Sequence, residues 1–176
     1  MLIRLIRSAA LVIPALAVCA CASNPRTELY GLDPASAAMV RQTCTDIMGL
    51  RAGVEFDACN DSLAQSVRAL HDARVIARAN ERCEQQGLLP GTAALATCVV
   101  VSKRTEAPPA WEHAAPISVS DAHPGRSYFR MSPSQQDERM ELSCAQLGLH
   151  PAWGGFRQCV MNLKDAIFTA QNPRPL

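Results

Sequence analysis

The sequence predicts an all-α fold of disulfide-stapled helical hairpins, with about five helices, one of them long. Two observations lead to this fold class. Six cysteines form three pairs, each pair 15 positions apart, and the three segments they enclose align with one another. Apolar residues at helical spacing flank these segments, so each segment is interpreted as the bend between two helices. An internal repeat is a stronger signal than a single motif, because chance would have to produce it repeatedly.

The three segments, units one to three, read CTDIMGLRAGVEFDAC, CEQQGLLPGTAALATC and CAQLGLHPAWGGFRQC. Each unit has Gly-Leu four to five residues after its first cysteine and a bulky apolar residue three positions before its second. Glycine after a helix enters the left-handed conformation at little cost, and the next residue then packs back on the last helical turn. These glycines are Gly49, Gly87 and Gly148, and the apolar residues are Phe56, Leu95 and Phe156.

In units two and three this ending places Leu88 and Leu149 over the cysteine of their own unit. Pro90 and Pro151 are expected in the first turn of the return helix, where a missing N–H costs nothing. Thr92 is an alternative N-cap in unit two.

The helix geometry favours disulfides within each hairpin. The first cysteine lies about four residues before its helix ends, and the second lies six to eight residues into the return helix. Measured from the bend along the helix axes, the positions of the two cysteines differ by about one turn or less. Closing each loop of about 15 residues is expected to stabilise a hairpin by about 3 kcal/mol in the chain-entropy model. The predicted pairs are Cys44–Cys59, Cys83–Cys98 and Cys144–Cys159.

Other roles for these cysteines are less consistent with the spacing. Structural zinc uses close cysteine pairs, which this sequence lacks among the six. No C-x-x-C is present for thioredoxin-type exchange, and no C-x-x-C-H for haem attachment. A redox-active bridge stays open as an alternative, although the sequence does not single out one pair.

The flanking stripes predict which faces meet. Cysteines lie on apolar stripes at helical spacing on both sides of the bends in units one and three. The lead-helix stripes are Val40, Cys44 and Ile47, and Met140, Cys144 and Leu147. The return-helix stripes are Phe56, Cys59, Leu63, Val67 and Leu70, and Phe156, Cys159, Leu163 and Ile167.

The helices follow in order along the chain. A first helix is predicted over about 34–48, with Asp33 as N-cap and Pro34 at the first position. Residues 55–86 contain no Gly or Pro, so one long helix is expected to join units one and two. A third helix is expected over about 92–103.

The predicted organisation is a signal peptide over 1–20, a tether over 21–33, hairpin units one and two over 34–104, a Pro-rich linker over 105–133 and a third hairpin over 134–171. The linker has no periodic apolar pattern. It lengthens the interval between units two and three relative to that between units one and two.

The N-terminus predicts the compartment. Arg4 and Arg7 precede an apolar run that ends at Ala20, a layout typical of a bacterial export signal and too short for a membrane span. The stretch VCAC that ends at Cys21 resembles the lipobox of bacterial lipoproteins. That resemblance implies a diacylglyceryl thioether and an N-terminal acyl chain on Cys21, since stable anchoring needs more than one chain.

Three other interpretations of the N-terminus remain. Cys19 could carry the lipid, although Val18 before it is a poor fit. Cleavage after Ala22 would leave a soluble periplasmic or secreted protein. The apolar stretch could also belong by chance to a cytoplasmic protein.

The charge argues against nucleic acid as a partner. The chain has 17 Lys+Arg and 16 Asp+Glu, net +1; without Arg4 and Arg7 the balance is 15 to 16, net −1. No basic excess would attract phosphates. The expected contacts are the membrane, through the N-terminal lipid, and a possible envelope protein.

No pattern predicts catalysis, and we expect no catalytic residue, cofactor or metal ligand. His71 and Asp72 are adjacent on a helix and so point to different faces, which makes them a poor dyad on a solvated surface. No G-x-S-x-G, H-E-x-x-H or phosphate-binding loop is present. Trp153 and Phe156 are expected to cap the third hairpin; exposed, they would contact a partner or glycan.

Unit three, and more loosely unit two, resemble a repeat of uncharacterised small exported alphaproteobacterial proteins, C-x3-G-L-x-P-G-x3-F-x2-C. Unit two departs with Leu95 in place of Phe, unit three lacks Gly after Pro151, and unit one has no Pro. The resemblance covers 16–20 residues per unit. It implies a scaffold and a compartment, and no site residue is carried over.

Together these observations predict a lipid-anchored cell-envelope protein that faces the periplasm and acts as a non-enzymatic structural or interaction module. The competing hypothesis is a periplasmic enzyme or thiol-redox protein with a site between hairpins.

Overall fold

The computed structural model describes residues 31–105 and 127–173, and over these ranges the all-α prediction is confirmed. Two short turns, η1 (Thr43–Ile47, π-helical) and η3 (Tyr128–Arg130, 3-10), accompany the α-helices. The α-helices are α2 (Pro34–Gln42), α3 (Val54–Gln85), α4 (Ala93–Thr105), α5 (Pro133–Gln146) and α6 (Gly154–Gln171). The signal segment, Cys21 and most of the linker lie outside the described residues.

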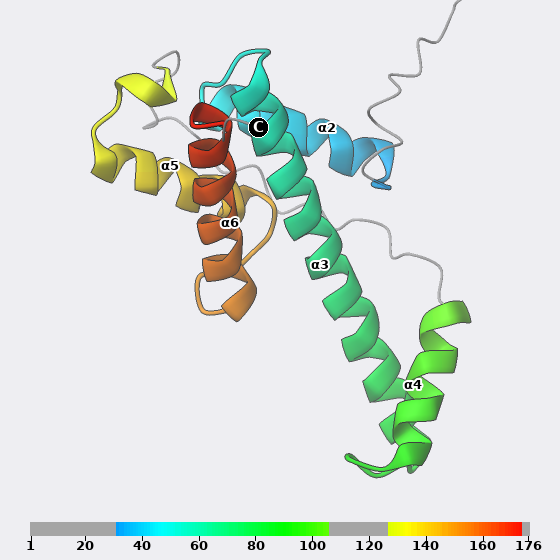
Figure 1. The fold of residues 1–176 in the computed structure, drawn as a ribbon. Coiled ribbons are helices and arrows are strands. Elements are labelled where there is room, and N and C mark those ends of the chain that lie inside the picture. The colour runs from blue at the N-terminus through cyan, green and yellow to red at the C-terminus, as the bar shows by residue number, and fades with distance from the viewer. Residues whose placement is uncertain (1–30, 106–126, 174–176) are drawn as a thin grey trace, which may run out of the picture.

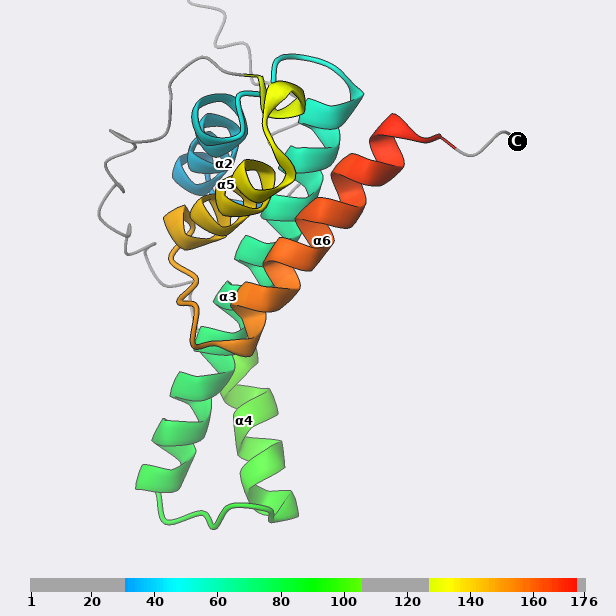
Figure 2. The same ribbon diagram turned by 90° about the vertical axis from the view of Figure 1, so that its left-hand side faces the viewer.

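The helices form two regions that share α3 (Figures 1 and 2). We call residues 31–70 and 127–173 the body; it contains α2, η1, the first half of α3, α5 and α6. We call residues 71–105 the arm; it is the second half of α3 with α4 folded back beside it. In both views the arm extends away from the body, and α4 lies beside the end of α3. The long helix that joins units one and two is therefore confirmed, at 32 residues.

The body encloses one hydrophobic core that units one and three build together. The predicted stripes of both units meet there except at Ile47, which is buried but is not part of this cluster. Phe56 and Phe156 are partly buried against the core. The core residues are Val40, Cys44, Met48, Leu50, Cys59, Leu63, Val67, Leu70, Tyr128, Met140, Cys144, Leu147, Leu149, Cys159, Leu163 and Ile167. Every member of this cluster belongs to the body.

Asp33 caps α2 as predicted, with Pro34 in the first position. Its carboxylate accepts hydrogen bonds from the backbone N–H groups of Ala35 and Ser36, each 3.0 Å away, and from the Ser36 hydroxyl. Burial by itself would raise the pKa of Asp33, but these hydrogen bonds to the charged form outweigh it and leave the pKa below its usual value.

The first helix differs from the prediction of one α-helix over 34–48. The α-helix ends at Gln42 and widens into the π-helical η1. The reason is the late Gly-Leu of unit one: the Leu50 N–H reaches the Cys44 carbonyl at 3.0 Å, six residues back. A π turn accommodates one extra residue without losing the backbone hydrogen bonds.

Units two and three have the expected helix ending. The N–H groups of Leu88 and Leu149 donate to the carbonyls of Cys83 and Cys144, five residues back, at 3.4 and 3.3 Å. In unit two, Gly87 lies directly before Leu88 and has φ +84°, the left-handed value that this ending requires.

The prediction for the two prolines was wrong. Pro90 and Pro151 lie in the bends, because α4 begins at Ala93 and α6 at Gly154. In unit two Gly91 follows with φ +80°, a conformation that an α-helix cannot contain. Thr92, the alternative cap, starts α4 instead, and its Oγ1 accepts from the Leu95 N–H at 3.2 Å.

Arg139 joins the two hairpins of the body. Its side chain on α5 is 6% exposed, and its guanidinium donates to the carbonyl of Ile47, at the end of η1, across 2.6 Å. A buried guanidinium therefore supplies a donor to a helix end whose carbonyls lack intrahelical partners.

Tyr128 in η3 is also part of the body core. Burial raises the pKa of Tyr128 to about 12, and the negative charge of Asp137 adds to the shift.

Candidate functional site

Each of the three disulfides joins the two cysteines of one unit, as the spacing predicts, with Cα atoms 6.1 Å apart in every pair. Their surroundings differ. The four body cysteines are at most 1% exposed and belong to the body core. In the arm, Cys83 is fully buried but Cys98 is partly exposed. Among the described residues, the arm disulfide is therefore the one that solvent reaches.

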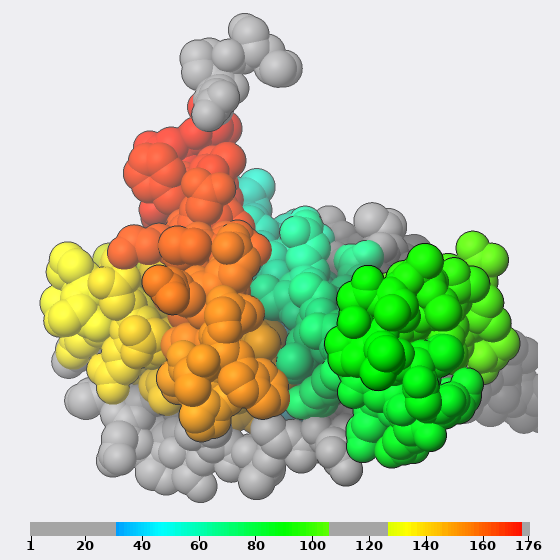
Figure 3. All heavy atoms as spheres, turned by 90° about the horizontal axis from the view of Figure 1, so that it is seen from below, coloured from blue at the N-terminus to red at the C-terminus, as the bar shows by residue number. Residues whose placement is uncertain are grey.

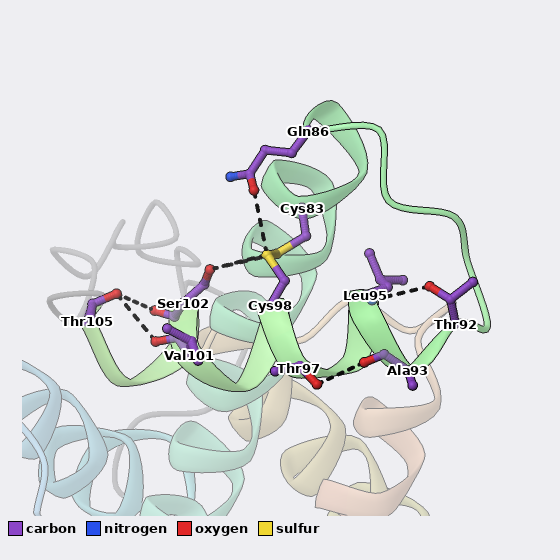
Figure 4. The surroundings of a disulfide bond; sticks show 10 residues. All are labelled: Cys83, Gln86, Thr92, Ala93, Leu95, Thr97, Cys98, Val101, Ser102 and Thr105. Carbon is purple, nitrogen blue, oxygen red and sulfur yellow. Dashed lines mark hydrogen bonds between the residues drawn. A yellow bond between two sulfur atoms is a disulfide. The ribbon is translucent and has the colours of Figure 1, made fainter.

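Ser102 lies beside the arm disulfide, one turn beyond Cys98 on α4 (Figure 4). Its Oγ is 3.7 Å from the Cys83 sulfur and 3.9 Å from the Cys98 sulfur. A bridged sulfur carries no proton, so the hydroxyl is the donor in both contacts. For the same reason Gln86 Oε1, 3.9 Å from the Cys98 sulfur, forms no hydrogen bond with the closed bridge.

The arm has little apolar packing of its own. Its buried apolar residues are Val75, Ala79, Cys83 and Leu95, and α4 packs mainly on α3. An ion pair between Lys103 and Asp72 spans the two helices at 3.7 Å, but both side chains are largely exposed. Exposed pairs of this kind contribute little to stability. The disulfide is thus a large part of what holds α4 against α3.

The face of α4 opposite Leu95 exposes apolar side chains beside polar ones. Ala93, Thr97, Val100 and Arg104 follow one another at helical spacing along it, and Val101 borders them. Val100 and Val101 are 53% and 55% exposed. No acidic residue occurs in α4. A helix that shows valines to solvent and lacks carboxylates differs from a usual solvated surface helix.

The charges of the two regions have opposite sign. The arm has five Lys/Arg and three Asp/Glu, whereas the body has seven Lys/Arg and nine Asp/Glu. Arg74, Arg78 and Arg82 follow at intervals of four residues, so they share one side of α3. At the bend, Leu89 is 70% exposed. Figure 3, which views the molecule from the arm side, shows the residues of the bend and α4 at the surface.

A second candidate is a groove in the body between α3 and α6. Asp57, Asp61 and Asp165 line it, together with Ser62, whose hydroxyl oxygen is buried without a hydrogen-bond partner. Over 31–105 and 127–173 no group of His, Cys, Asp and Glu side chains has the arrangement of a metal site. The groove therefore brings carboxylates to one surface but holds no ligand set.

The remaining candidates from the sequence do not assemble into a site. Asp72 faces Lys103, and His71 is partly buried with its Nε2 unpaired, so the expected solvated histidine was wrong in part and the two residues form no dyad. Trp153 is 51% exposed, which corrects its predicted role in capping the hairpin, whereas Phe156 packs on the core. Cys21 and the lipobox lie outside the described residues.

Comparisons with protein-family models, with curated proteins and with solved structures find no match to this chain. None of the helices over the described ranges combines the length and apolar character needed to cross a membrane. The exposed residues of α4 were not predicted from the sequence, although the run Val99–Val101 in a helix without acidic residues was a signal that could have identified them.

Proposed function

We propose that this chain is a cell-envelope lipoprotein, anchored through Cys21 and facing the periplasm, that acts as a non-enzymatic interaction module. In this proposal the body is the scaffold and the arm is the contact element. The observation that carries it is the outward face of α4, where Val100 and Val101 are exposed on a helix without acidic residues. Exposed apolar surface on a projecting element is typical of interaction sites.

Three disulfides support an oxidising compartment. The net positive charge of the arm favours a partner with acidic residues. The partner proposed is an envelope protein with an apolar groove bordered by carboxylates, into which α4 inserts its outward face.

The anchor is tested by labelling with a fatty acid. The wild-type protein is expected to take up label and to fractionate with membranes, and Cys21→Ala is expected to lose both properties. A Cys19→Ala variant is the matched control and should keep its label. Label that survives in Cys21→Ala would contradict the assignment of the anchor.

The contact element is tested by placing a photo-crosslinking amino acid at Val100 in the exported protein. Met161 on α6, 51% exposed, is the control position in the body. A protein adduct is expected from position 100 and not from position 161. Arg104→Glu should weaken the adduct, whereas Arg157→Glu, an exposed arginine of the body, should not. Equal adducts from both positions, or adducts with lipid alone, would refute the arm as the contact element.

One observation favours the competing hypothesis of a thiol-redox protein with a site between hairpins: Cys98 is partly exposed. A catalyst would turn over a dithiol substrate repeatedly through Cys83 and Cys98. Reduction of a model disulfide such as insulin, measured with and without the protein, distinguishes a catalyst from an interaction module.

A further inference from the structure

We infer that the Cys83–Cys98 disulfide makes the arm redox-sensitive: a dithiol reductant opens this bridge while both body bridges stay closed, and opening releases α4 from α3. The inference concerns regulation of the contact element and so rests on the proposed function for its biological meaning. The chemical claim itself depends only on the described residues of the arm and the body.

The first argument is access. Thiol–disulfide exchange requires a thiolate to reach a bridge sulfur. The sulfurs of Cys44, Cys59, Cys144 and Cys159 lie in the body core, where their residues are at most 1% exposed. Cys98 is partly exposed on α4. A reductant can therefore approach the Cys98 sulfur in the folded protein, whereas it reaches the body sulfurs only after the core opens.

The second argument is the chemistry at the bridge. One thiolate of the reductant attacks the Cys98 sulfur, a mixed disulfide forms, and Cys83 leaves as a thiolate. The second thiol of the reductant, as thiolate, then attacks the mixed disulfide and releases Cys98. Two electrons pass to the bridge, the reductant becomes a disulfide, and its two protons end on Cys83 and Cys98.

Ser102 assists the leaving sulfur. Its hydroxyl is 3.7 Å from the Cys83 sulfur and is the donor of that contact. A hydrogen bond to a thiolate stabilises the charged form and speeds departure. Ser102 is a positioning residue in this step. After reduction, the Cys98 thiolate takes up a proton, and the resulting thiol can donate to Gln86 Oε1, which is 3.9 Å from that sulfur in the oxidised protein (Figure 4).

The third argument is what holds α4 in place. An isolated helix of 13 residues is marginal in water, so α4 depends on its contacts with α3. To those contacts α4 contributes one buried apolar side chain, Leu95, and its half of the bridge. In the body, by contrast, the return helix α6 buries Leu163 and Ile167 against α3 and α5 as well as its own bridge. Loss of the bridge therefore frees α4 but would leave α6 packed.

The experiment uses the full exported chain under graded dithiothreitol, with alkylation and peptide mass spectrometry to identify each freed cysteine. Cys83 and Cys98 are expected to be labelled about tenfold or more faster than the four body cysteines. Hydrogen exchange of the same samples should show faster exchange in α4 and unchanged exchange in α6. Simultaneous reduction of all three bridges, or a reduced arm in which α4 stays protected, would overturn the inference.

Two variants sharpen the test. Ser102→Ala should slow reduction of the arm bridge without changing hydrogen exchange of the oxidised protein, whereas Thr97→Ala, on the outward face of α4, should change neither. Cys83→Ser/Cys98→Ser should reproduce the fast exchange of α4 without reductant. These measurements need no partner, so failure of the crosslinking at Val100 would leave them intact, and the reverse also holds.

Discussion

The body and the arm are built from the same repeat and use it differently. In the body, units one and three share a core in which both bridges are buried. In the arm, the bend and return helix of unit two fold back mainly on α3, with a partly exposed bridge and few buried side chains. The comparison indicates that the same cysteine spacing adds stability to a well-packed unit in the body, whereas in the arm it holds a helix that has few other buried contacts.

The difference also separates two physical roles of a disulfide. A crosslink stabilises mainly by restricting the unfolded chain, and loops of equal length give a similar gain. The gain is therefore similar in all three units, and the packing around each bridge determines what its loss changes. In the body the loss lowers the stability of a cooperative unit; in the arm it changes the position of one helix.

The largest expected effect comes from deleting matched leucines. Leu163→Ala, at a side chain with no exposure, should lower the free energy of unfolding of the body by about 2–5 kcal/mol, since it leaves a cavity in the shared core. Leu95→Ala should leave that transition unchanged and speed hydrogen exchange only in α4. Urea unfolding followed by circular dichroism measures the first effect. A global loss of similar size from Leu95→Ala would mean that arm and body unfold as one unit.

A smaller effect tests whether the two hairpins of the body are one unit. Arg139→Met removes the donor to the Ile47 carbonyl and should cost about 1.5–3 kcal/mol, the range for a buried hydrogen bond with a charged group. Arg139→Lys should recover part of the loss. Chemical unfolding monitors both variants, and a change below about 0.5 kcal/mol would show that the contact does not couple units one and three.

The smallest effects compare the helix caps. Asp33→Ala in the body and Thr92→Ala in the arm should each cost about 1 kcal/mol, the first in global unfolding and the second only in exchange of α4.

The cap at Asp33 should also depend on pH. Because the folded-state pKa of Asp33 is lowered, its contribution to the free energy of unfolding is complete above the unfolded pKa of about 3.9 and is lost as the pH falls through the folded pKa.

Measuring the free energy of unfolding as a function of acidic pH tests this contribution of Asp33. The wild type should lose stability in that acidic range faster than Asp33→Ala, while Thr92→Ala should follow the wild type. Parallel curves for the wild type and Asp33→Ala would show that the carboxylate contributes no charge-dependent stabilisation to the cap.

Much of each hairpin could be predicted because its signals are local. Gly87 and Gly148 mark the helix ends, Asp33 and Pro34 mark the start of α2, and a separation of 15 residues brings paired cysteines to similar heights. The predicted positions of Pro90 and Pro151 in the first helical turn were wrong because nearby residues delay the helix start. Gly91 directly after Pro90, and Trp153 two residues after Pro151, adopt non-helical conformations.

By itself, the sequence determined the helices, their bends and the three bridges, because each depends on residues within about two helical turns of a cysteine or glycine. Only the tertiary structure decided that units one and three share a core, that Arg139 reaches Ile47 across 92 positions, and that Cys98 and Val100 remain accessible. The physical reason is that exposure depends on which neighbours cover a face, and those neighbours come from distant segments. A repeat written three times in the chain thus has the same disulfide spacing in all three bends but two different environments.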